Sequence, residues 1–79
     1  MNFSSTKFQI NAEINRVCNP EWNVTAIMDE SCPDVVRLED IEMEGGQNSW
    51  DGTPTEALEL FSSLPSTCDW VRFWRTFQD

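Results

Sequence analysis

The clearest fold signal in the chain is the stretch Thr53-Pro54-Thr55-Glu56-Ala57-Leu58-Glu59-Leu60-Phe61. Thr53 is a favourable N-cap residue, Pro54 suits the first helical position, and Glu56 can bond back to the cap. Apolar residues follow at helical spacing as far as Leu64, and Pro65 ends or sharply bends the helix. The stretch therefore predicts a helix that begins next to Thr53.

A second helix is predicted directly after the first. Its start is marked by another capping pattern, Ser66-Thr67-Cys68-Asp69. Four aromatic residues then stand at positions i, i+3, i+4 and i+7, namely Trp70, Phe73, Trp74 and Phe77. We expect this aromatic stripe to cover the apolar face of a sheet, and a partner-binding surface is the alternative.

The residues before these helices have the alternation of strands. In residues 7–16 the apolar side chains Phe8, Ile10, Ala12 and Ile14 alternate with polar ones, which predicts a strand with one wet face. Asn19-Pro20 is a turn signal, and residues 22–28 alternate again as a second, antiparallel strand.

Residues 35–43 are open to two interpretations. The β-branched start at Val35-Val36 favours a strand, with a bulge near Glu39-Asp40. The alternative is a helix that Gly45-Gly46 would end. With the strand interpretation, residues 1–79 form one small α+β domain: an antiparallel β-meander of about three strands, with two C-terminal helices packed on one face.

Charge is concentrated in the middle of the chain. The chain has fourteen acidic and five basic residues and a net charge of −9. Ten of the acids lie between Asp29 and Glu59, where Arg37 is the one base, so the remaining residues sum to zero. This balance opposes direct binding to nucleic acid, because affinity for phosphate needs lysine and arginine. A carboxylate array can instead steer the protein toward a basic surface.

The candidate partner-binding residues come from this acidic segment. On the strand interpretation, Arg37 and Glu39 face outward together. After the bulge, Asp40, Glu42 and Glu44 project together at roughly 6–7 Å spacing, close to the phosphate spacing of an extended nucleic-acid strand. Trp50 is either an apolar anchor for a partner or a loop aromatic that folds back on the core. The full set is Asp29, Glu30, Asp34, Glu39, Asp40, Glu42, Glu44, Trp50 and Asp51.

The sequence predicts no enzyme, no cofactor and no metal site. Histidine, the commonest general base and metal ligand, is absent from the chain. Residues 48–52 match a calcium loop only loosely. We expect Cys18, Cys32 and Cys68 to be free thiols, with one disulfide and one spare thiol as the alternative. A Cys68 thiolate stabilised by Arg72 is the one conceivable nucleophile.

The location is predicted to be cytoplasmic. The chain has no run of 18 or more apolar residues, so we expect no membrane span. Its first seven residues lack the apolar region of a secretory signal.

In general character the chain resembles the small acidic proteins that phages direct against host machinery, in particular anti-CRISPR and anti-restriction proteins. The shared features are the Asp29–Glu59 charge block, Asn and Trp residues in loops, and the lack of an enzyme motif. The resemblance is one of type rather than of motif, so it assigns no residue a role. It implies a stoichiometric inhibitor that blocks a DNA- or RNA-binding site of a larger protein or ribonucleoprotein complex. We expect the chain itself to be a monomer or a weak dimer. The alternative function is an adaptor or assembly subunit that binds through the aromatic helix face.

Overall fold

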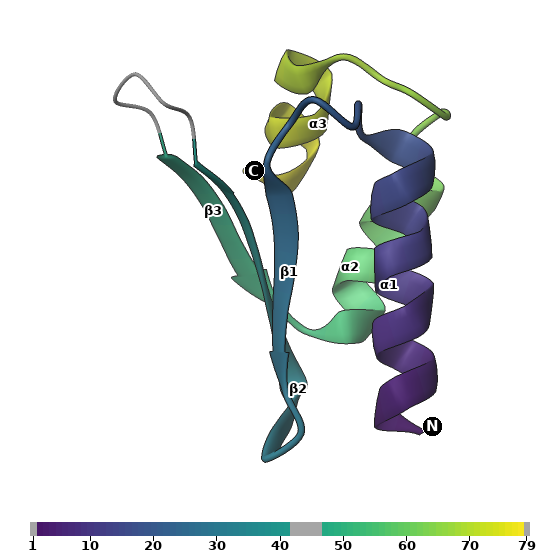
Figure 1. The fold of residues 1–79 in the computed structure, drawn as a ribbon, viewed down its shortest axis with the longest axis vertical. Helices are drawn as coiled ribbons and strands as arrows, with labels where there is room; N and C mark the ends of the chain where they lie inside the picture. Colours follow the sequence, from purple (N-terminus) through teal and green to yellow (C-terminus); the bar gives the residue numbers. More distant parts are fainter. Residues whose placement is uncertain (1, 42–46, 79) are drawn as a thin grey trace.

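The computed structural model describes residues 2–41 and 47–78. Its elements in chain order are α1 (Phe3–Val17), β1 (Val24–Asp29), β2 (Cys32–Ile41), β3 (Gln47–Gly52), α2 (Pro54–Ser62) and α3 (Trp70–Phe77). The strands form an antiparallel sheet in the order β1-β2-β3, and the helices lie on one side of it (Figure 1). The predicted α+β class, with a three-stranded antiparallel meander and two C-terminal helices, is confirmed. The strands differ in part, because residues 7–16 form a helix and β3 occupies residues that had been expected to form a loop.

The N-terminal helix α1 corrects the strand predicted for residues 7–16. Its buried apolar residues are Ile10, Ile14 and Val17, which share one helical face, whereas Phe8 is 73% exposed. Ile10 and Ile14 fit both a period of two and a helical period, so the alternation was ambiguous there. Asn2 resolves it, because its side chain accepts a hydrogen bond from the Ser4 backbone N–H at 2.7 Å and caps the helix.

Segment 35–41 is a strand, as the preferred interpretation predicted. The bulge expected near Glu39-Asp40 is wrong, because Val24 pairs with Asp40 and Thr25 with Glu39 in unbroken register. The irregularity lies on β1 instead, between residues 27 and 29. Regular pleating turns Asp40 toward the helices on the same face as the buried Val36 and Leu38.

The two C-terminal helices begin at caps. The predicted capping box of α2 is confirmed: Thr53 Oγ1 accepts from the Glu56 N–H, and Glu56 Oε1 accepts from the Thr53 N–H, both at 3.1 Å. Helix α3 is capped by Asp69, whose carboxylate accepts from the N–H groups of residues 71 and 72. Cys68 therefore precedes the cap and lies outside the helix.

The aromatic stripe of α3 belongs to the core, which confirms the preferred interpretation. Phe73 is fully buried, and its ring centroid lies 4.9–6.1 Å from those of four other rings. Those rings belong to Trp22, Phe61, Trp74 and Phe77. Offset and edge contacts of this kind stabilise beyond the area that they bury, so α3 holds the sheet and α2 together.

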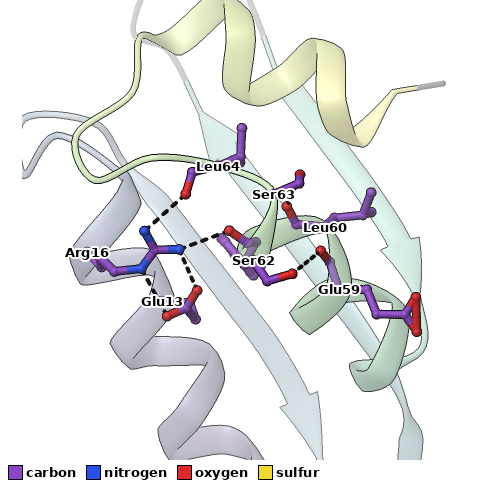
Figure 2. Close-up of polar contacts among 8 residues, drawn as sticks. Glu13, Arg16, Glu59, Leu60, Ser62, Ser63 and Leu64 are labelled. Atoms are coloured by element: carbon purple, nitrogen blue, oxygen red, sulfur yellow. Dashed lines mark hydrogen bonds and ion pairs between the residues drawn. The ribbon is translucent and has the colours of Figure 1, made fainter.

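Arg16 joins the C-terminal ends of α1 and α2 (Figure 2). Its guanidinium donates to the backbone carbonyl oxygens of Phe61 and Leu64 at 2.9 and 3.0 Å, and it pairs with Glu13 at 2.7 Å. The hydrogen bond from Arg16 lowers the pKa of the Glu13 carboxyl. The N-terminal turns of α1 and α2 also lie near each other, at the other end of the pair, so the two helices run in the same direction (Figure 1).

Candidate functional site

The turn between β1 and β2 carries a group of exposed acids. Asp29 ends β1, Glu30 lies in the turn and Asp34 is the third residue of β2. The turn forms one extremity of the sheet (lower end in Figure 1). Gly52 pairs with Val36, so the chain enters α2 close to the same end. The exposed Glu56 of the first α2 turn adds a fourth carboxylate. We call Asp29, Glu30, Asp34 and Glu56 the acidic end.

The acids of the β1–β2 turn are not neutralised within the described part of the chain. None of Asp29, Glu30 and Asp34 forms an ion pair with a residue of 2–41 or 47–78. Asp29 accepts a hydrogen bond from the Ser31 backbone N–H at 3.0 Å, and this bond lowers the pKa of its carboxyl. Asp29 therefore stays ionised to a lower pH than an ordinary aspartate.

Arg37 neutralises two other candidate residues. Arg37 and Glu39 face outward, as expected, but the guanidinium binds Glu39 at 2.9 Å and Asp51 at 3.0 Å. These bonds raise the pKa of Arg37, and the hydrogen bond to Glu39 makes the largest contribution. Glu39 and Asp51 thus offer a partner less negative charge than the sequence indicated.

Asp40 is removed from the surface set. Its side chain is buried with 2% exposure, and its carboxylate accepts hydrogen bonds from the indole N–H of Trp70 and, at 3.3 Å, of Trp74. The expectation that Asp40 projects outward is wrong, because the expected bulge is absent. The predicted row of acids at phosphate spacing therefore loses Asp40, and its other two members, Glu42 and Glu44, lie outside the described residues.

Trp50 folds back on the core, which was the more conservative of its two interpretations. It lies on β3 with its ring edge-on to Phe77, 5.2 Å between centroids, and it is half-buried. Its indole also covers Gly52, where an added Cβ would collide with the ring. We therefore leave Trp50 out of the site, although sequence reasoning had included it.

A cavity of about 470 Å³ opens beside the acidic end. It lies between the first turns of α1 and α2 and the beginning of β2, and its lining includes Phe3, Pro33, Asp34, Pro54, Thr55 and Leu58. Sequence reasoning missed this cavity because one wall is the N-terminal turn of α1, and this helix was not expected: residues 7–16 had been predicted as a strand. The Asn2 cap was the signal that could have revealed it.

The cysteines are free thiols, and two of the three are buried. Cys18 and Cys68 are buried, whereas Cys32 is exposed. Burial raises the pKa of Cys18 to about 12. Burial also raises the pKa of Cys68, with a further contribution from Asp69, and together these outweigh the lowering effect of Arg72. The hypothesis of a Cys68 thiolate stabilised by Arg72 is therefore wrong.

These surroundings predict that one thiol reacts in the folded protein. Titration with a thiol-specific chromophoric reagent near pH 8 should modify Cys32 rapidly, because thiolates are the reacting species and Cys32 is accessible. Cys18 and Cys68 should react only after urea unfolds the chain. The variant Cys32→Ser should abolish the fast phase, and a fast phase that persists in it would contradict the burial of the other two thiols.

The described residues contain neither a metal-binding cluster nor a helix that could span a membrane. Within 2–41 and 47–78, no group of three or more Asp, Glu or Cys side chains is arranged to hold a metal ion. No helix in the same ranges has the length and apolar character needed to cross a membrane.

Comparisons with protein-family models, with curated proteins and with solved structures found no match to this chain.

Proposed function

We propose that this chain is a non-enzymatic protein inhibitor of the cytoplasm that binds a basic, nucleic-acid-binding surface of a larger protein or ribonucleoprotein complex. The observation that carries the proposal is the β1–β2 turn, where three exposed carboxylates stand without a basic partner in the described chain. Carboxylates can accept the arginine and lysine hydrogen bonds that phosphates otherwise receive.

The distribution of basic residues supports this assignment. Arg16 and Arg37 are held in ion pairs. The exposed Arg72 and Arg75 lie on α3, whereas the acidic turn is at the far end of the sheet (Figure 1). A cationic surface that approaches the turn meets an attractive field, which raises association rates and favours one orientation of docking.

The adaptor alternative loses its main support. It required the aromatic face of α3 to be available, but Phe73, Trp74 and Phe77 are buried in the core. Trp70 is half-buried, and Val71 is 54% exposed. One such aliphatic residue is ordinary for a surface and marks no interface.

Charge reversal at the acidic end is the test of this function. The immobilised chain captures basic proteins from a bacterial lysate at low salt, and one captured nucleic-acid-binding protein is then used in a competition assay. In this assay the chain should displace a labelled oligonucleotide, and high salt should weaken the displacement. We expect Glu30→Lys/Asp34→Lys to raise the concentration needed by at least about tenfold, because two attractive charges become repulsive.

The control for this test is Glu21→Lys/Glu59→Lys, which changes the net charge by the same amount at two other exposed positions. It should retain most of the displacement. Equal losses in both double variants would show that net charge alone acts, and no loss in Glu30→Lys/Asp34→Lys would overturn the proposed function.

A further inference from the structure

The cavity at the acidic end has the size and position of a binding site. Its volume of about 470 Å³ lies within the range of about 300–1,000 Å³ typical of ligand pockets. It is open because α1 and α2, joined at their C-terminal ends by Arg16, leave a space at their N-terminal ends where β2 begins. Pro33 and Asp34, which follow the β1–β2 turn, line this opening.

Its lining combines four apolar residues, three threonines and one carboxylate. Phe3, Pro33, Pro54 and Leu58 supply the apolar surface, and Asp34 supplies the charge. Arginine and lysine have the complementary construction, since an apolar stem of three or four methylene groups carries a cationic head. Such a side chain can lay its stem along the apolar walls and bring its head to Asp34.

The competing occupant is an anion, because two helix N-termini open toward the cavity and helix N-termini attract negative charge. In this chain one N–H donor of each helix N-terminus is already engaged, since the Ser4 N–H donates to Asn2 and the Glu56 N–H donates to Thr53. Asp34 is the charged residue among the described residues that line the opening, and Glu56 follows Thr55 in the first turn of α2. The balance is negative and favours a cation.

We propose that this cavity receives an arginine or lysine side chain of the partner protein, with the stem against Pro33, Pro54 and Leu58 and the cation at Asp34. The inference rests on the proposed function and deepens it: the acidic end attracts the basic surface, and the cavity holds one side chain of that surface. The shape of the cavity thereby provides a specificity that general charge attraction does not.

The binding test uses small probes and backbone amide NMR shifts of the labelled chain. Nα-acetylarginine amide and Nα-acetyllysine amide, whose side chains keep their charge, should give saturable shifts at Thr55 and Leu58. N-acetylnorleucine amide, which has a stem without charge, should bind at least about tenfold more weakly, and so should guanidinium ion, which has charge without a stem. Preferential binding of N-acetylglutamate amide would overturn the proposal in favour of an anion site.

A pair of variants at one position separates the cavity from the surrounding charge. Thr55 is exposed and lines the cavity, so Thr55→Trp should fill the space and weaken the arginine probe by at least about tenfold, whereas Thr55→Ala should leave its binding within about twofold. Circular dichroism and thermal unfolding should be used to check that both variants are folded. Neither substitution changes the net charge.

A second matched pair of variants tests the charge of Asp34. Asp34→Asn should weaken the arginine probe by several-fold, and Glu21→Gln, with the same change in net charge at an exposed position outside the cavity lining, should not. Equal effects of these two variants would overturn the role of Asp34.

The two proposals fail in distinguishable ways. If Thr55→Trp leaves the arginine probe unaffected while Glu30→Lys/Asp34→Lys still prevents oligonucleotide displacement, the cavity inference is wrong and the proposed function stands. If the probe binds as expected but charge reversal does not affect displacement, the proposed function is wrong, and with it the assignment of the cavity to that partner.

Discussion

Replacing Phe73 by alanine is expected to unfold the chain. Phe73 has no exposed surface and touches four other aromatic rings, so Phe73→Ala removes the centre of the core and leaves a cavity. Such substitutions cost about 3–5 kcal/mol. A domain of this size has a net stability of only about 3–5 kcal/mol. The folded population should therefore fall to a minority at room temperature.

The matched control is Phe8→Ala, which removes the same side chain from an exposed position. Phe8 is 73% exposed on α1, so its loss should change the free energy of unfolding by less than about 0.5 kcal/mol. Urea unfolding followed by circular dichroism at 222 nm, a wavelength that reports helix, checks both variants. A large loss in Phe8→Ala would indicate that residues 7–16 bury Phe8, as the strand prediction required.

The comparison of Phe8 with Phe73 also shows why some elements could be predicted and one could not. The aromatic residues of α3 follow the helical period and no other, so both the helix and its buried face were predicted correctly. In α1 the residues Ile10 and Ile14 are four apart, a spacing that fits a strand face and a helix face equally. The choice depended on Asn2 and Val17, at the two ends of the segment.

For the acidic segment, too, some features could be predicted from the local sequence and others depend on the tertiary structure. Composition correctly located the negative charge between Asp29 and Glu59, and the β1–β2 turn exposes three of its carboxylates. Which acids are neutralised depends on pairing across the sheet. Arg37 meets Asp51 because these two residues are opposite each other in the β2–β3 register, fourteen positions apart in the sequence. No local pattern contains that information.

The burial of Asp40 was likewise not predictable from its neighbours. The strand period places Asp40 on the face of Val36 and Leu38, but a carboxylate at an apolar position is usually taken to face water. Its two donors, Trp70 and Trp74, come from a helix thirty or more positions later in the chain. The two tryptophans of α3 therefore make Asp40 a structural residue of the core rather than a member of the acidic surface.

This arrangement predicts that Asp40→Leu loses about 2 kcal/mol of unfolding free energy. Trp74 is 3% exposed, so its indole N–H would be left buried without an acceptor, and an unsatisfied buried donor costs about 1–3 kcal/mol. The substitution also removes a buried carboxylate that has no cationic partner in the described residues, and the relief of that desolvation offsets part of the loss. Urea unfolding followed by circular dichroism measures the net result.

The variant Asp40→Asn separates the acceptor from the charge. Its amide oxygen can still accept from the indoles of Trp70 and Trp74, so we expect a loss of less than about 1 kcal/mol. Asp40→Leu should be the less stable of the two because it alone leaves the indoles without an acceptor. If Asp40→Leu were as stable as the parent chain, the cost of burying the carboxylate would equal the gain from its two indole hydrogen bonds. Asp40 would then not stabilise the attachment of α3 to the sheet.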